Sequence, residues 1–88
     1  MEKFAKLFES EVYGQILVLM DTEEGDPVLK ISVCPPGLGV CSCTIKFEDD
    51  DAGLDGQEKA FSEFTQEMGE EIAASIFENS APIAAAFI

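Results

Sequence analysis

Apolar and polar residues alternate along three stretches in the first half of the chain, which predicts β-strands. Residues 13–20 (YGQILVLM) form a run rich in large and β-branched side chains, while residues 28–34 (VLKISVC) and 40–47 (VCSCTIKF) alternate with a period of two. The polar turn at 21–27 (DTEEGDP) joins the first two as a hairpin, and the Pro-Pro-Gly-Leu-Gly of 35–39 forces a turn before the third. We therefore expect a three-stranded antiparallel meander.

The start of the chain has a spacing that is typical of a helix. Phe4, Leu7 and Phe8 stand at i, i+3 and i+4 with charged residues between them, so residues 1–10 predict a short amphipathic helix. The alternative is a strand that begins earlier and extends the run at 13–20 backwards through Val12.

The second half predicts one long helix over residues 57–79. Asp55 would be its N-cap and Glu58 the capping-box partner. Apolar residues recur there at spacings of three and four, namely Ala60, Phe61, Phe64, Met68, Ile72 and Ile76. Ser80 would cap a short second helix in the tail, residues 81–88.

These elements predict a single α+β domain over residues 1–88, with the long helix packed on the sheet. The helix side chains expected in the core are Phe61, Phe64, Met68 and Ile72, and they would cover Leu29, Ile31, Cys43 and Ile45 on the strands.

The chain has a strong excess of acidic over basic residues, so the predicted domain is a polyanion. Eighteen Asp and Glu face five Lys, with no Arg and no His, for a net charge of −13. Residues 1–47 hold seven acids and four Lys, whereas residues 48–88 hold eleven acids and one Lys. Such a surface repels phosphate, which disfavours direct binding to nucleic acid or to an anionic membrane, so the expected partner is a basic protein surface.

The acids of the second half are the candidate partner-binding residues. Helix glutamates four residues apart lie about 6 Å apart along the axis, about twice the 3.4 Å spacing of phosphates along a DNA strand, so loop acids would supply the remaining charge. The predicted surface consists of Glu48, Asp49, Asp50, Asp51, Asp55, Glu63, Glu67, Glu70 and Glu71. The alternative interpretation is a surface that only keeps the domain soluble.

The chain resembles the small acidic inhibitors that phages encode, including DNA mimics and anti-CRISPR proteins. The resemblance lies in its size, its lack of Arg and His, the acidic run Asp49–Asp50–Asp51 and the glutamate-rich helix. The resemblance implies a stoichiometric inhibitor that occupies the basic nucleic-acid-binding surface of a bacterial nuclease or CRISPR surveillance complex. It would act in the host bacterial cytoplasm. Two other functions stay open: a homo-oligomeric structural or adaptor protein that uses sheet edges and the apolar tail, and an immunity protein for a basic toxin.

The sequence predicts neither catalysis nor a cofactor. Without His the commonest general base is missing, and Cys34, Cys41 and Cys43 fall short of the four ligands of structural zinc, so we expect Cys41 and Cys43 to pack in the core. Residues 51–56 resemble the start of a calcium loop, but Gly53 and Ser62 stand where ligands are needed. The odd number of Cys and the absence of a signal-peptide pattern predict a cytoplasmic protein, and no apolar run approaches the roughly 20 residues of a membrane span.

Overall fold

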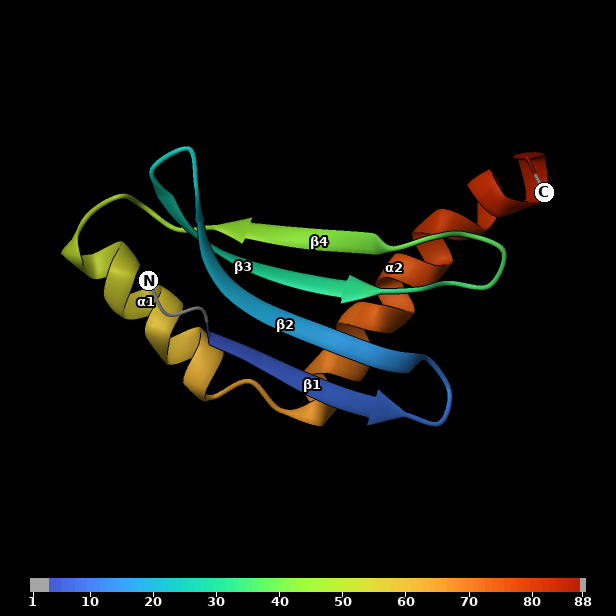
Figure 1. The fold of residues 1–88 in the computed structure, drawn as a ribbon, viewed down its shortest axis with the longest axis horizontal. Helices are drawn as coiled ribbons and strands as arrows, with labels where there is room; N and C mark the ends of the chain where they lie inside the picture. Colours follow the sequence, from blue (N-terminus) through green and yellow to red (C-terminus); the bar gives the residue numbers. More distant parts are fainter. Residues whose placement is uncertain (1–3, 88) are drawn as a thin grey trace.

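A computed structural model describes residues 4–87 as a sheet of four strands followed by two helices (Figure 1). The strands are β1 (Phe4–Ser10), β2 (Gly14–Glu23), β3 (Asp26–Val33) and β4 (Cys41–Lys46), and the helices are α1 (Asp51–Ser62) and α2 (Gln66–Phe87). Each strand pairs antiparallel with the next, in the order β1-β2-β3-β4. The antiparallel sheet, the α+β class and the long C-terminal helix agree with the prediction.

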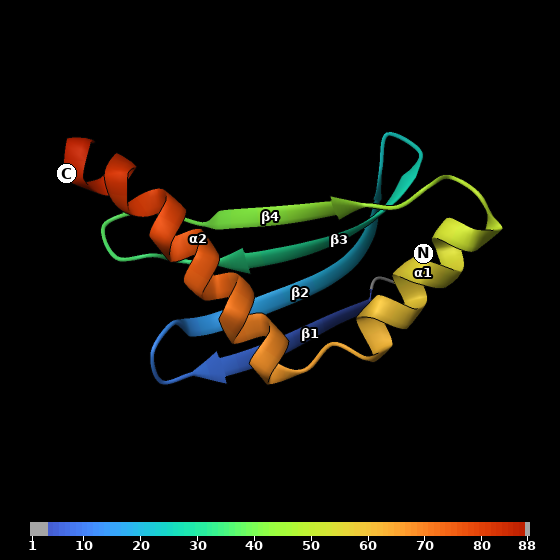
Figure 2. The same cartoon turned by 180° about the vertical axis from the view of Figure 1, so that it is seen from behind.

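Both helices cover the same face of the sheet, with α2 running obliquely across the strands (Figures 1 and 2). The core lies between these two layers. Its buried strand side chains come from alternate positions of β2 and β3, because successive side chains of a strand point to opposite faces. The core cluster consists of Ile16, Val18, Leu29, Ile31 and Val33 from the sheet and Phe64 and Ala73 from the helical half.

The prediction of an N-terminal helix was wrong, because residues 4–10 form β1. Register with β2 places Lys6 opposite Val18 and Phe8 opposite Ile16, on the face that the helices cover. Lys6 reaches over the end of α1, where its Nζ donates to the carbonyls of Phe61 (2.6 Å) and Ser62 (3.2 Å). Lys6 lies on the face that the helices cover, and Leu7 lies on the opposite, open face. The apolar residues therefore do not alternate with a period of two, and their spacing resembles that of a helix.

The hairpin between β2 and β3 is tighter than the predicted turn at 21–27. Only Glu24 and Gly25 lie outside the strands, and both have positive φ, 54° and 87°. Two consecutive residues with positive φ are typical of a type I′ turn, whose twist matches that of the paired strands. Both strands therefore extend into the acidic segment.

The single long helix was also a wrong prediction, because α1 begins in the segment expected to be a loop. Asp50, rather than Asp55, is the N-cap, and its carboxylate accepts a hydrogen bond from the Gly53 N–H at 2.7 Å. Gln57 anchors α1 to the sheet, since its Nε2 donates to the carbonyls of Asp21 and Val28, each at 2.8 Å.

The break between α1 and α2 falls at residues 63–65. Glu63 is the C-cap of α1, and Phe64 turns into the core, where it is 5% exposed and lies 6.0 Å from the Phe8 ring. Thr65 then accepts a hydrogen bond from the Met68 N–H through its hydroxyl, as an N-cap does. The apolar spacing thus continues through a non-helical segment, which explains the prediction of one helix.

The tail is not a separate helix, because α2 continues to Phe87 with Pro82 inside it. Ser80 does not act as a cap; its Oγ donates to the Phe77 carbonyl at 3.2 Å. The predicted core is partly wrong as well. Phe64 is buried, but Met68 is 41% exposed and Ile45 is 39% exposed.

Candidate functional site

Two segments rich in Asp and Glu, the β2–β3 turn and the start of α1, lie at the same end of the molecule (Figure 1). Residues 21–26 and 48–58 together hold ten of the 18 acids and no Lys. We call these two segments the acidic end. They are brought together by the hydrogen bond from Gln57 to the Asp21 carbonyl, because Gln57 lies on α1 and Asp21 on β2.

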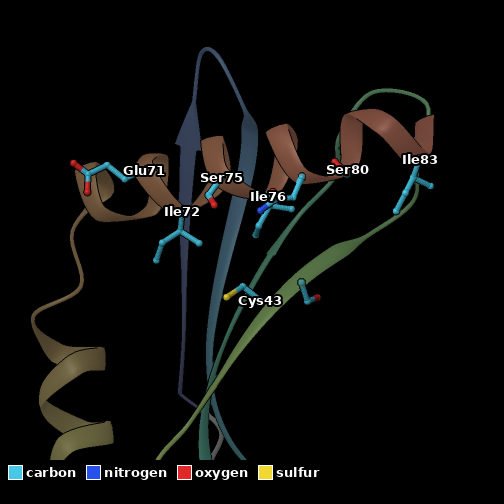
Figure 3. Close-up of a pocket in the computed structure, with 9 residues that line it drawn as sticks. Cys43, Glu71, Ile72, Ser75, Ile76, Ser80 and Ile83 are labelled. Atoms are coloured by element: carbon cyan, nitrogen blue, oxygen red, sulfur yellow. The ribbon is translucent and has the colours of Figure 1, made fainter. Parts of the chain in front are cut away.

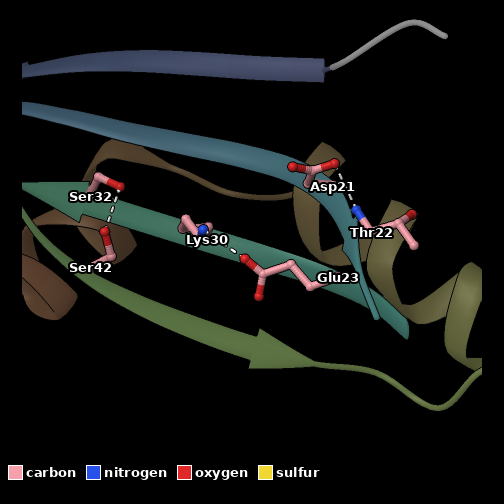
Figure 4. A network of polar contacts seen from close by, with 6 residues as sticks. All are labelled: Asp21, Thr22, Glu23, Lys30, Ser32 and Ser42. Carbon is pink, nitrogen blue, oxygen red and sulfur yellow. Dashed lines mark hydrogen bonds and ion pairs between the residues drawn. The ribbon is translucent and has the colours of Figure 1, made fainter. Parts of the chain in front are cut away.

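Two lysines outside these segments partly offset the charge of the turn. Lys30 pairs with Glu23 at 2.7 Å (Figure 4), and Lys46 lies 3.8 Å from Glu24 and 4.0 Å from Asp26. The hydrogen bond to Glu23 and then the negative charge of Glu23 raise the pKa of Lys30 above its usual value of 10.5.

The acids that lead into α1 have no such basic partner among the described ion pairs. All five predicted loop acids are exposed, and they follow one another from the end of β4 into α1. Asp50 has a structural task as the N-cap, which its carboxylate performs at the positive end of the helix dipole. The functional candidates that remain in this segment are Glu48, Asp49, Asp51 and Asp55.

Glu63, Glu67 and Glu71 stand four residues apart (i, i+4, i+8) and would share one face of the predicted long helix, but they do not lie on one helix. Glu63 caps α1, whereas Glu67, Glu70 and Glu71 belong to the first turns of α2, so the i, i+4, i+8 series is interrupted by the break between the helices. Glu70 is partly buried and accepts a hydrogen bond from Ser10 Oγ at 2.7 Å. This glutamate therefore fixes the β1–β2 connection to α2.

Five acids of the acidic end were absent from the predicted surface. They are Asp21, Glu23, Glu24 and Asp26, together with Glu58 on α1. Their signal was present in the sequence, because the hairpin turn DTEEGD was recognised. What sequence reasoning lacked was the position of α1, whose early start brings residues 48–58 to the same end as the turn.

The second surface feature is a groove of about 510 Å³ between β4 and α2 (Figure 3). Cys43 contributes from β4, and Ile72, Ile76 and Ile83 contribute from α2, while Glu71 lies at one end and points away from Cys43. Cys41 and Cys43 are only partly buried and do not belong to the core cluster, so the prediction that they pack in the core was wrong. Cys43 lines the groove instead.

Within residues 4–87, no group of three or more Cys, Asp or Glu side chains is placed to hold a metal ion. The three cysteines are free thiols, with Cys34 exposed. Neither helix in the described part of the chain has the length and apolar character that crossing a membrane requires.

No protein-family model, no curated protein and no solved structure matches this chain significantly.

Proposed function

We propose that the protein binds the basic, nucleic-acid-binding surface of another protein through its acidic end and thereby displaces nucleic acid from it. One observation carries this proposal: residues 21–26 and 48–58 hold ten acids and no Lys, and the fold brings the two segments to the same end. A partner that holds phosphates with Lys and Arg gains the same electrostatic attraction from carboxylates.

The carboxylates of the acidic end sit on ordered backbone. Glu23 and Asp26 flank a two-residue turn, Asp51 and Asp55 lie on α1, and Gln57 ties that helix to β2 and β3. A segment whose backbone is already ordered loses little conformational entropy when it binds a partner. A disordered acidic tail would lose more.

The test is a competition experiment on a partner captured with the full chain from a bacterial lysate. Binding of that partner to a labelled DNA duplex is followed by fluorescence anisotropy while the chain is added. We expect the chain to displace the duplex at about 50 mM NaCl. Direct binding of the labelled chain to the partner should weaken steeply between about 50 mM and about 200 mM NaCl, because this complex is held by screened charges.

Two triple variants distinguish the contribution of the acidic end to displacement from the contribution of the overall net charge. Asp49→Asn with Asp51→Asn and Asp55→Asn removes three charges from the acidic end and leaves the Asp50 cap in place. The control, Glu9→Gln with Glu11→Gln and Glu78→Gln, removes three charges from elsewhere. Only the first should weaken displacement at least about tenfold, as expected for the loss of several close charge contacts. Equal losses in both would mean that net charge alone acts, and no displacement by the parent chain would refute the proposal.

A further inference from the structure

The two edge strands of the sheet, β1 and β4, differ in their contacts with the rest of the described chain. Beside β1 runs the connection between the helices, where Gln66 Nε2 donates to the Glu9 carbonyl at 3.0 Å and Lys6 holds the end of α1. Among residues 4–87, β4 is the last strand on the other side and pairs only with β3. Exposed edge strands offer unpaired backbone groups to another chain.

The outward backbone groups of β4 can be assigned from one hydrogen bond. The Phe47 N–H donates to the Pro27 carbonyl at 2.9 Å, directly opposite it in the continued register. Residues of an antiparallel strand alternate between bonding toward one neighbour and toward the other side. Cys43 and Ile45 therefore bond toward β3, and the N–H and C=O groups of Ser42, Thr44 and Lys46 point out from the sheet.

Apolar surface accompanies this edge on the helix-covered face. Covered-face residues of β2 and β3 such as Ile16 and Ile31 are fully buried, whereas Ile45 on β4 is 39% exposed and Cys43 faces the groove. The last turns of α2 continue past β4 (Figures 1 and 2), and Ile83 on them is 55% exposed. An apolar helix end thus extends over a space that no strand fills in the described chain.

The distribution of charge around β4 and the end of α2 indicates which partner could bind at this edge. Residues 27–47 contain two Lys and no acid, and residues 79–88 contain no charged residue. A basic partner finds no cluster of carboxylates here, whereas a second copy brings a surface equally poor in acids and keeps the two acidic ends apart. The two lysines of this segment, Lys30 and Lys46, are paired with acids of the β2–β3 turn. The edge has the further property that antiparallel pairing of a strand with itself is compatible with a two-fold axis.

We propose that a second copy of this chain docks here, β4 against β4 in antiparallel pairing, which joins the two sheets into one. Residues directly opposite each other in such a pair point to the same face. Cys43 and Ile45 of both copies then lie on the helix-covered face, where the projecting end of each α2 covers the β4 of the other. The groove is closed by the partner's side chains.

The experiment measures the mass of the full chain by sedimentation equilibrium. We expect twice the chain mass of 9.5 kDa, and a dimer fraction that holds or rises with NaCl, because added salt screens the repulsion between two polyanions. This salt response is opposite to that of the proposed complex with a basic partner. The Asp49→Asn, Asp51→Asn, Asp55→Asn triple should remain dimeric, so failure of one proposal leaves the other testable.

Three variants locate the interface. Thr44→Pro removes an outward N–H without removing a bond to β3, and Ile83→Lys places a charge in the apolar contact; both should give a folded monomer by circular dichroism and sedimentation. The matched control is Leu7→Lys, which is 56% exposed, close to Ile83 at 55%, but lies on the open face of the sheet. It should remain a dimer.

A monomeric parent chain would overturn the proposal. So would a dimer that survives both Thr44→Pro and Ile83→Lys, or one that Leu7→Lys dissociates, because the contact would then lie elsewhere. If Thr44→Pro does not fold, Ile83→Lys decides alone. A monomeric parent whose Ile83→Lys variant loses a captured partner would assign the groove to another protein.

Discussion

Phe64 is the side chain through which the non-helical segment between α1 and α2 contributes to the core. It is 5% exposed and packs against Phe8 of β1, while Met68, four residues later, is 41% exposed. Phe64→Ala should lower the free energy of unfolding by about 3–5 kcal/mol, because it leaves a cavity. Urea unfolding of the variant measures the loss.

Met68→Ala is the matched control for this prediction, since the uninterrupted helical stripe would bury both residues equally. In the observed fold it should change the free energy of unfolding by less than about 1 kcal/mol, as surface substitutions generally do. Similar losses in the two variants would contradict the break between the helices.

The two glycines of α1 should respond to alanine in opposite directions. A Cβ on Gly53 would collide with the backbone of Glu48, which folds back over the first turn of the helix. A Cβ on Gly56 would meet only the ring of Phe47, at 3.4 Å. Gly53→Ala should therefore destabilise the protein by more than about 1 kcal/mol, while Gly56→Ala should stabilise it by about 0.5–1 kcal/mol.

Paired thermal and urea unfolding curves of the two variants test this contrast. Stabilisation by Gly53→Ala would mean that residue 48 does not approach the helix, and the early start of α1 would then be wrong.

At the scale of elements, Pro82 is the point of weakness in α2. Proline has no N–H, so the helical bond to the Glu78 carbonyl four residues earlier is not made, and its ring crowds that carbonyl. Pro82→Ala should stabilise the end of α2, by up to about 3 kcal/mol. Hydrogen exchange of residues 83–86 should slow, and unchanged exchange would show that Pro82 does not limit this end.

The elements that could be predicted from the sequence are those whose own residues carry the pattern. β2, β3 and β4 follow from alternation and turn residues. In β2, Ile16 and Val18 are fully buried while Leu17 between them is 39% exposed. In β3, Ile31 and Val33 are buried while Ser32 between them is only partly buried. β1 could not be predicted in this way, because Lys6 is directed inward by a partner 55 residues away, the Phe61 carbonyl. Such a contact has no local signature.

The candidate acids could be chosen from composition, whereas their arrangement in space could not be predicted from the sequence. The acids of residues 48–55 were selected for their density, and the fold does place them together. The glutamates Glu63, Glu67 and Glu71 were joined by a helical period that α1 and α2 interrupt. The cap at Thr65 was the available local signal, but its meaning depends on Phe64 turning into a core that only the assembled sheet provides.

At the scale of the whole molecule, the net charge of −13 should oppose folding at low ionic strength. Raising NaCl from about 0.1 M to about 1 M shortens the Debye length from about 10 Å to about 3 Å. The melting temperature should rise over this range, and KCl should act as NaCl does. A falling melting temperature would mean that the ion pairs of Lys30 and Lys46 outweigh the repulsion among the acids.

The charges are also distributed unevenly along the long axis of the molecule. Its longest extent is 43 Å. Acid-rich segments, the β2–β3 turn and the start of α1, lie at one end, and the uncharged end of α2 lies at the opposite end. Such a body carries a large electric dipole moment. In the field of a positively charged surface it experiences a torque as well as an attraction, so it rotates during approach and arrives with the acidic end leading. Diffusional encounters that would otherwise be lost to wrong orientations become productive ones.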